Sequence, residues 1–364
     1  MAKQPLRLAI VGCGDIAQYV TRFARLNRRI QLAAACDVSA DRAEAFARRF
    51  KIPQTFTDYA AMLEQAELDA VYLAVPHHLH GEMMATAVAH HTPVFTEKPV
   101  TRTLAEGQKI AQLAAAQGIK IGVNYQYRYD SGCHRLARAV QNGDLGAVHS
   151  VRINIPWHRK ADYFDHAAWH SKIATAGGGT LLTQGSHFLD VVLWALAGDD
   201  PVTAVGYTAQ RKFKTSSAPA HRGKDTTERI EVEDLAQGII QMASGALIQI
   251  SSSMVASSEQ ATSIEVYGER ATAVYSPSPL PHVKFRDAPV KAPKPPHRGI
   301  HALQRSLEGF RAWVMDDVPY LTPAPSALPV LAAVEAIYRS AQSEKREEIE
   351  DWRLENRENA LSNL

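Results

Sequence analysis

Short apolar runs alternate with amphipathic segments through the first third of the chain. The apolar runs predict β-strands, and the segments between them carry the three-to-four-residue apolar repeat of α-helices. Regular alternation of strand and helix predicts a doubly wound parallel sheet covered by helices on both faces. The predicted strands are 6–11, 31–36, 70–74, 93–96 and 120–123, and the predicted helices are 16–26, 40–50, 59–65, 81–90 and 104–117.

The pattern changes after residue 124. Several later runs alternate apolar with polar positions, as half-buried antiparallel strands do. We therefore predict an α/β domain over residues 1–124 and an α+β domain over 125–364 with a large, mostly antiparallel open sheet. The later strands are predicted at 148–155, 202–207, 235–242, 246–253, 263–267 and 272–275, and the helices at 134–142, 300–315 and 326–343.

Three segments of the second domain carry further expectations. The polar stretch 212–227 is predicted to be a mobile connection, and 276–299, which holds seven prolines, an extended surface loop. Strand 246–250 reads Ala-Leu-Ile-Gln-Ile and suggests apolar groups on the uncovered face of the sheet. Because a broad apolar patch usually marks an interface, we expect a homodimer or homotetramer.

Composition narrows the class of protein. The 364 residues include 40 basic and 38 acidic side chains, and this balance gives no electrostatic case for nucleic acid or an anionic membrane as partner. No apolar run approaches eighteen residues, and the N-terminus lacks a signal-peptide pattern. Cys13, Cys36 and Cys133 are scattered and odd in number, which is typical of reduced thiols. We expect a cytoplasmic protein.

The first chemical signal follows the first predicted strand. Residues 12–17 read G-x-G-x-x-A and lead into a helix. Gly12 permits a tight turn, Gly14 lets the backbone approach a pyrophosphate, and the helix N-terminus offers free N–H groups. Asp37, twenty residues after Ala17, suits the ribose hydroxyls and would repel a 2′-phosphate. We therefore predict a Rossmann domain that binds NAD. Arg42, which is close to Asp37 in the sequence, is the feature that leaves NADP binding open.

Two further motifs carry candidate chemistry. Residues 96–99 read Thr-Glu-Lys-Pro and follow a predicted strand, whose carboxyl end should face the ligand crevice. A glycine run at 177–179 opens a helix on which Thr183, His187, Asp190 and Trp194 share one stripe. By itself, this stripe is equally consistent with a solvent-exposed helix face.

Together these motifs resemble the Gfo/Idh/MocA family of oxidoreductases. The resemblance covers nearly the whole chain and is carried by the glycine turn, Glu97-Lys98-Pro99 and the glycine-rich motif 177–190, in that order. It implies a Rossmann domain, a second domain with an open sheet, and often a cis Lys98–Pro99 bond. It also implies hydride transfer between a nicotinamide and a carbinol or ketone of a sugar, cyclitol or nucleotide sugar.

On these motifs we assign candidate site residues. Lys98 is expected to carry the substrate proton once burial depresses its pKa, with His187 and Thr183 beside it. The cofactor set is Gly12, Gly14, Asp15, Ile16, Asp37, Val75, Pro76, His77, His80, Glu97 and Lys98. The substrate set is Arg128, Trp157, Trp169, Gln184 and Asp190.

The sequence departs from the family pattern in two places. Many family dehydrogenases carry Asp where this chain has Thr183, and a hydroxyl there can orient a group but cannot relay a proton. Residues 169–172 read Trp-His-Ser-Lys in place of a common Trp-Arg-Gly. Two alternatives therefore stay open beside the dehydrogenase: an NAD-assisted glycosidase and a catalytically silent NAD-binding sensor.

A metal is not expected. Histidines gather at His77, His78 and His80 and at His158, His166 and His170, but neither group has the spacing of a known metal-ligand motif. A carbinol can lose a hydride to nicotinamide without a metal when a base is present.

Overall fold

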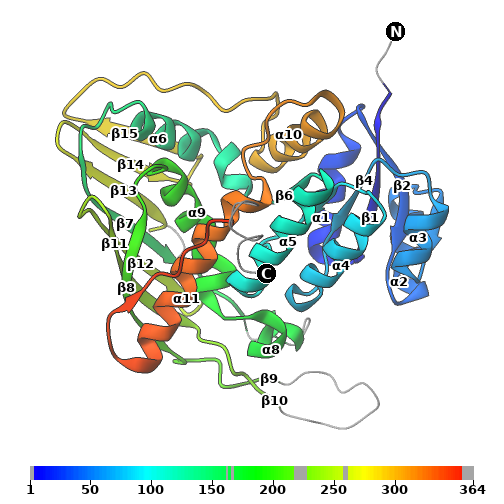
Figure 1. The fold of residues 1–364 in the computed structure, drawn as a ribbon, viewed down its shortest axis with the longest axis horizontal. Helices are drawn as coiled ribbons and strands as arrows, with labels where there is room; N and C mark the ends of the chain where they lie inside the picture. Colours follow the sequence, from blue (N-terminus) through cyan, green and yellow to red (C-terminus); the bar gives the residue numbers. More distant parts are fainter. Residues whose placement is uncertain (1–3, 161–162, 165–167, 217–227, 257–260, 355–364) are drawn as a thin grey trace, which may run out of the picture.

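The computed structural model describes residues 4–160, 163–164, 168–216, 228–256 and 261–354. Its first unit is a parallel six-stranded sheet in the order β3-β2-β1-β4-β5-β6 (Figure 1). The direction of winding reverses between β1 and β4, so a crevice opens at the carboxyl ends of these strands. The strands are β1 (Leu6–Val11), β2 (Ile30–Cys36), β3 (Gln54–Phe56), β4 (Ala70–Leu73), β5 (Val94–Thr96) and β6 (Ile121–Val123). The helices are α1 (Asp15–Arg25), α2 (Ala40–Phe50), α3 (Tyr59–Gln65), α4 (His77–Ala89) and α5 (Leu104–Gln117).

Periodicity predicted this unit except at two places. Strand β3 was not predicted, because three residues of which two are exposed give no apolar run. Helix α4 begins at His77, four residues before the predicted start, with Pro76 as its N-cap residue. Proline is compatible with a helix start, so the glycine at position 81 lies inside the helix rather than at its beginning.

The second sheet has eight strands in the order β15-β14-β13-β7-β12-β11-β8-β16. All neighbouring pairs are antiparallel except β12 and β7, so the predicted mostly antiparallel sheet is confirmed. A separate two-stranded ribbon pairs β9 (Thr215–Ser216) with β10 (Glu228–Arg229). The sheet strands are β7 (Val148–Pro156), β8 (Pro201–Ala209), β11 (Leu235–Met242), β12 (Leu247–Ser253), β13 (Ser263–Gly268), β14 (Thr272–Ser276), β15 (His282–Arg286) and β16 (Glu347–Glu348).

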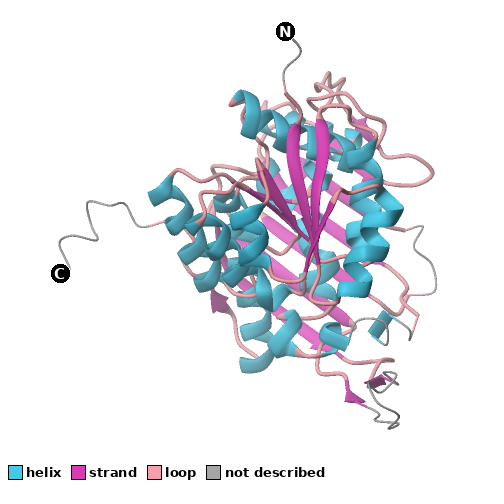
Figure 2. Cartoon of the chain, turned by 90° about the vertical axis from the view of Figure 1, so that its right-hand side faces the viewer, coloured by secondary structure: helices cyan, strands magenta, loops and turns pink. Residues whose placement is uncertain are grey.

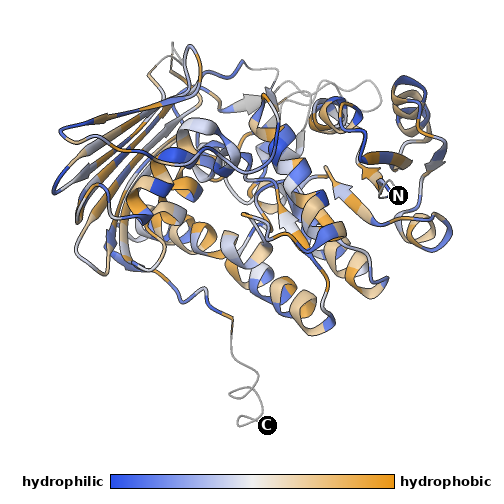
Figure 3. Ribbon diagram, turned by 90° about the horizontal axis from the view of Figure 1, so that it is seen from above, coloured by the Kyte–Doolittle hydropathy of each residue, from blue (hydrophilic) through white to orange (hydrophobic). Residues whose placement is uncertain are grey.

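One face of the second sheet is covered by helices that lie between the two sheets (Figures 1 and 3). These are α6, α9 and α11, which pack on β14–β15, β7 and β8 respectively. A π-helical turn, η3, leads directly into α9. The bounds are η1 (Gln126–Tyr129), α6 (Ser131–Gln141), η2 (Ala168–Ser171), α8 (Ile173–Ala176), η3 (Leu181–Gly185), α9 (Ser186–Ala195), α10 (Ala302–Asp316), η4 (Ala324–Ala327) and α11 (Leu328–Ser343).

Helix α10 crosses back to the first unit. The Phe310 ring stacks on Phe95 of β5 with centroids 5.1 Å apart, and Phe310, Tyr320 and Leu303 belong to the same buried cluster as the core of β1 and α1. The Thr322 main chain also bonds to Val123 of β6. Figure 2 shows the helices grouped around the first sheet. The C-terminal segment therefore fixes the two units against each other.

The other face of the second sheet is uncovered by the described residues (Figure 3). Our reading of strand 246–250 needs correction here: Ala246, Ile248 and Ile250 are buried beneath the helices, and only Leu247 is an exposed apolar residue. Exposed apolar side chains on this face come instead from neighbouring strands, including Tyr207 and Ile239.

The predicted loop at 276–299 contains a strand that was not predicted. Strand β15 pairs with β14 at the sheet edge, and its prolines, such as Pro281 and Pro289, lie outside the paired residues. An edge position tolerates flanking prolines because few ladder hydrogen bonds are lost. Of the predicted connection at 212–227, residues 217–227 lie outside the described part, as does His166. In the part that the structure describes, helices fall short of the length and apolarity that a membrane span requires.

Candidate active site

The glycine turn between β1 and α1 has the geometry that its sequence predicts. Gly12 adopts φ +82°, and a Cβ there would lie 2.4 Å from the Ala74 carbonyl oxygen, so no other residue fits. A Cβ at Gly14 would meet nothing within 4 Å, and the N-terminus of α1 has no side-chain cap. The turn thus leaves open space in front of unpaired helix N–H groups, which fits the pyrophosphate of a dinucleotide.

Asp37 directly follows β2 and lies beside the turn. Its carboxylate accepts hydrogen bonds from the Cys13 and Ser39 main-chain N–H groups at 3.0 and 2.9 Å and from the Arg42 guanidinium at 2.8 Å. Burial acts to raise the pKa of Asp37, but these hydrogen bonds outweigh it and hold the pKa below its usual value. The carboxylate is therefore charged and held where the adenosine ribose of a bound NAD would lie.

A cavity of about 1140 Å³ runs from this turn to the second domain. This exceeds the roughly 300–1,000 Å³ typical of small-ligand pockets and suits a dinucleotide together with a second molecule. Most predicted site residues line it: Gly12, Gly14, Asp15, Ile16, Asp37, Val75, Pro76, His77, Glu97, Lys98, Trp157, Trp169, Thr183, Gln184 and His187.

Lys98 lies directly after β5 and points to the second domain. Its Nζ donates to the Thr183 main-chain carbonyl at 2.6 Å. Burial lowers the pKa of Lys98 to about 8; the Glu97 carboxylate opposes this shift and the Arg159 guanidinium adds to it. The Lys98–Pro99 peptide is cis, as the resemblance implied. An amine with this pKa is neutral often enough near physiological pH to take up a proton.

The Thr183 side chain is turned away from this contact. Its hydroxyl donates to the Gly179 carbonyl at 2.7 Å, within its own helix. The π-helical turn Leu181–Gly185 contains Thr183, whose carbonyl accepts from Lys98. The side chain therefore bonds to the Gly179 carbonyl and contacts Tyr163, whereas the main chain of the same residue accepts from Lys98.

His187 lines the crevice between two tyrosines. Its ring lies edge-on to Tyr125 and Tyr127, with centroids 6.2 and 5.3 Å away. Burial, together with the charges of Lys98 and Arg159, holds the pKa of His187 well below its usual range. Its Nδ1 and the Gln184 Nε2 are buried without a hydrogen-bond partner among the described atoms. Such buried unpaired groups are costly, and both belong to side chains that line the cavity.

Glu97 and His80 organise the crevice rather than react in it. The Glu97 carboxylate accepts from the Tyr72 hydroxyl at 2.6 Å and from Asn124 Nδ2 at 2.7 Å. The His80 ring, expected beside the nicotinamide, is fully buried behind the lining, with its nitrogens 2.8 Å from the Pro99 carbonyl and 3.0 Å from that of Val75. His80 therefore joins the loops that follow β4 and β5.

Arg128 and Asp190, expected to bind substrate, do not line the cavity. Arg128 Nε and Nη2 donate to the two Asp190 oxygens at 2.8 and 2.6 Å, and both side chains are buried. Arg128 also donates to the carbonyls of Leu321 and Ser326, at 2.7 and 3.0 Å. The arrangement supports a structural tie between α9 and the segment before α11, and we withdraw the substrate assignment for this pair.

Sequence reasoning missed several residues of the crevice. Arg159, Tyr163 and His170 line its second-domain end, and the Tyr163 ring stacks on His170 with centroids 4.6 Å apart. Burial, with Lys98 and Arg159 nearby, lowers the pKa of His170 to about 3, so this ring stays neutral. The aromatic spacing around Trp157 and Trp169 was the available signal, but no local pattern distinguishes a lining residue from its neighbours.

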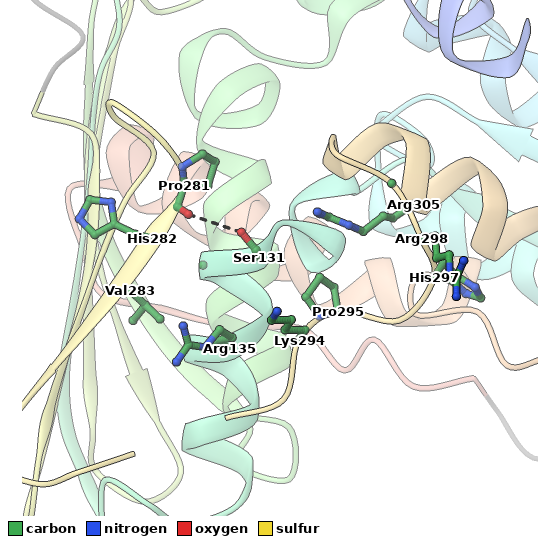
Figure 4. Close-up of a pocket in the computed structure, with 12 residues that line it drawn as sticks. Ser131, Arg135, Pro281, His282, Val283, Lys294, Pro295, His297, Arg298 and Arg305 are labelled. Carbon is green, nitrogen blue, oxygen red and sulfur yellow. Dashed lines mark hydrogen bonds between the residues drawn. The ribbon is translucent and has the colours of Figure 1, made fainter. Parts of the chain in front are cut away.

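A second hollow of about 450 Å³ lies between α6, β15 and the segment before α10 (Figure 4). Basic side chains surround it, among them Arg135, Lys294, Arg298 and Arg305. Neither the glycine turn nor Lys98 borders this hollow, so it is separate from the site described above.

Comparison with known proteins agrees with this geometry. Residues 6–125 match the model of an oxidoreductase family with an NAD-binding Rossmann fold, and residues 133–274 match the GFO/IDH/MocA C-terminal domain. The chain belongs to the Gfo/Idh/MocA family. It is thus an NAD-binding oxidoreductase, and the predicted fold, family and cofactor are confirmed.

Several similar proteins are named as dehydrogenases of sugars or cyclitols. The chain is 25% identical to D-glucoside 3-dehydrogenase of Escherichia coli K12 over 355 residues, 96% of this chain and 99% of that protein. It is 26% identical to inositol 2-dehydrogenase of Salmonella paratyphi B over 217 residues, 58% of this chain and 60% of that protein. The WlbA dehydrogenase of Bordetella pertussis, solved with NADH and UDP-GlcNAcA, shares the fold with a TM-score of 0.77 at 24% identity, covering 96% of this chain and all of that one.

Proposed function

We propose that this chain is a dehydrogenase, or the matching ketone reductase, acting on a CH–OH group of a sugar, cyclitol or nucleotide sugar. The observation that carries the proposal is that Lys98, Gln184 and His187 line the same cavity as the dinucleotide turn. Gln184 and His187 each carry a polar atom without a hydrogen-bond partner among the described atoms. Bound NAD supplies the hydride acceptor, held by the glycine turn and Asp37.

The side chains of the cavity would transfer the proton and hold the substrate. In oxidation, the neutral Lys98 amine takes the hydroxyl proton of the substrate, and in reduction the ammonium returns it. The Thr183 carbonyl holds Nζ in place. Neutral His187 and Gln184 would hydrogen-bond the reacting hydroxyl or its neighbour, while Trp157 and Trp169 exclude water from the second-domain end.

A substrate screen tests this proposal. Wild-type protein with NAD is offered sugars, cyclitols and nucleotide sugars, and NADH formation is followed by fluorescence. We expect turnover with at least one class, and a loss of about a hundredfold or more in Lys98→Met with nearly intact NAD binding, the weight of a general base. Glycoside cleavage without net NADH would support the glycosidase alternative, and NAD binding without any turnover would support the sensor.

The cofactor preference has its own test. In Asp37→Ala the carboxylate that repels a 2′-phosphate is removed, and the released Arg42 can bind that phosphate. We expect the ratio of NAD to NADP affinity to fall by about tenfold or more, measured by titration of both cofactors. The double variant Asp37→Ala, Arg42→Ala should not gain NADP affinity to the same extent. Equal affinity of wild-type protein for both cofactors would contradict the argument.

We further propose a cytoplasmic homo-oligomer. Free, buried Cys13, Cys36 and Cys133 suit a reducing compartment. The uncovered face of the second sheet, with exposed Tyr207 and Ile239, is the surface through which copies would associate.

A further inference from the structure

Arg159 is a cation at the substrate end of the cavity. It follows strand β7 in the chain and lines the same cavity as Lys98 and His187. Its guanidinium carbon lies 5.4 Å from the Trp157 ring centroid and 5.5 Å from that of Tyr163. Aromatic faces on a guanidinium fix its plane but leave its N–H groups free to bind a ligand.

The charge of Arg159 lacks a compensating carboxylate in the described part of the chain. Its Nε is buried without a hydrogen-bond partner among the described atoms, and its main-chain N–H donates to the Met254 carbonyl. Glu97, which also lines the cavity, is already bound by Tyr72 and Asn124. Arg159 is only partly buried, but its guanidinium packs on two rings with no described carboxylate beside it, so the arrangement favours an anion supplied from outside.

The surroundings strengthen this imbalance. Lys98 is a second potential cation in the same cavity. Burial lowers the pKa of Lys98, His170 and His187, and the charge of Arg159 adds to each shift. The other carboxylates of the cavity, Asp15 and Asp37, lie at the cofactor turn at the opposite end. Among the described residues, the substrate end is therefore rich in cations and in neutral hydrogen-bonding groups.

We propose that Arg159 binds an anionic group of the substrate, a carboxylate or a phosphate, so that the substrate is an acidic rather than a neutral carbohydrate. This inference rests on the proposed function, since it names the class of molecule that Lys98 would deprotonate. The planar fork of a guanidinium matches both oxyanions by paired N–H···O bonds, which also fix the orientation of the bound molecule.

The test compares matched acidic and neutral probes binding to the NAD-loaded protein by titration calorimetry. The carboxylate arm pairs glucuronate with glucose. The phosphate arm pairs glucose 6-phosphate, and separately UDP-glucose, with glucose. In at least one arm we expect the acidic probe to bind about tenfold to a hundredfold more tightly, the weight of a charge-assisted hydrogen bond. The arm that shows the preference identifies the anion.

Variants assign the preference to Arg159. Arg159→Gln should abolish it while leaving NAD affinity unchanged, and Arg159→Lys, which keeps the charge without the fork, should retain part of it. Arg353→Gln is the matched control, because Arg353 also packs on a ring, that of Trp352, but is exposed outside the cavity. Thermal unfolding of each variant checks that loss of the ring contacts has not unfolded the protein.

Three results would overturn the inference: equal binding of acidic and neutral probes, a preference that survives Arg159→Gln, or no binding of any acidic probe at millimolar concentration. These outcomes are separable from the fate of the proposed function. Acid-selective binding without NAD reduction would support this inference and contradict the proposed dehydrogenase activity. Turnover of neutral sugars without a preference for acidic probes would support the dehydrogenase activity and contradict this inference.

Discussion

At the scale of single residues, the reactive group and the groups that tune it come from different parts of the chain. Lys98 follows a strand of the first unit, and its hydrogen-bond acceptor is the main chain of Thr183. Burial lowers the pKa of Lys98, and the charge of Arg159 in the second unit adds to this shift. A lysine exposed at the same strand end would keep its ordinary pKa. The proximity of the second domain therefore makes Lys98 usable as a base.

The first prediction concerns the pH dependence of oxidation. The reactive form of Lys98 is the neutral amine, so kcat/KM in the oxidation direction should rise with pH and level off above about 8. Reduction needs the ammonium and should show the opposite trend. His187 and His170 stay neutral because their pKa values are lowered, so the pH limb belongs to Lys98. A limb near pH 6 that disappears in His187→Ala would contradict this assignment.

The second prediction separates two residues on one helix stripe. His187→Ala removes a crevice hydrogen-bonding group and should reduce kcat by about tenfold to a hundredfold, with NAD affinity largely kept. Thr183→Ala should cost less, because the carbonyl that holds Lys98 remains and the losses are the hydroxyl's bond to the Gly179 carbonyl and its contact with Tyr163. Steady-state kinetics and NAD titration measure both variants. If Thr183→Ala proves the more damaging, its hydroxyl has a role that this geometry does not contain.

At the scale of elements, one buried carboxylate positions the helix that carries His187. Glu233 accepts hydrogen bonds from the main-chain N–H groups of Gly179 and Leu181 at 2.8 and 2.9 Å and from the Tyr338 hydroxyl at 2.9 Å. A Cβ at Gly179 would lie 1.9 Å from the Glu233 carbonyl oxygen. Gly179 is thus explained by close packing against Glu233, and its neighbour Gly178 by packing against the Tyr338 ring.

The third prediction follows from this contact. Glu233→Ala leaves two buried N–H groups unpaired and should lower the free energy of unfolding by about 2–4 kcal/mol, measured by urea denaturation. Turnover should fall as well, because the start of the helix loses its anchor. Glu231→Ala is the matched control: this neighbouring carboxylate is partly exposed and pairs with Lys172, so its loss should cost under about 1 kcal/mol. Similar losses in both variants would argue against the anchor.

At the scale of the whole molecule, α6, α9 and α11 cover one face of the second sheet, and the described residues leave its other face without cover (Figure 3). Exposed Leu247, Ile239 and Tyr207 lie on neighbouring strands of this face. None of the three lines the cavity.

The fourth prediction is therefore that the chain is a homo-oligomer in solution. Light scattering at micromolar concentration should give at least twice the chain mass of 39.9 kDa. Ile239→Arg should shift the protein toward the monomer, because a charge would be buried in the interface. Leu26→Arg, at an exposed apolar residue that follows α1 in the first unit, is the control and should leave the mass unchanged. A monomeric wild-type protein would refute the prediction.

The sequence by itself determined what depends on local backbone chemistry. Apolar periodicity predicted most strands and helices, Gly12 and Asp37 predicted the dinucleotide turn, and Lys98 was placed at a strand end where the sheet topology opens a crevice. These features follow from residues close together in the chain, whose conformational limits are intrinsic. Short or edge strands such as β3 and β15 were not predicted, because they contribute too few apolar positions.

Only the tertiary structure decided which polar side chains reach the cavity. Arg128 and Asp190 were expected there, but they are 62 positions apart and cancel each other's charge in a buried pair. Arg159, which no local motif marks, is left without a described carboxylate partner beside Lys98. Burying a charge is tolerable only beside its partner, and whether a partner is present depends on contacts between distant segments. The sequence shows which charges the chain has, and the fold determines which of them remain available to a substrate.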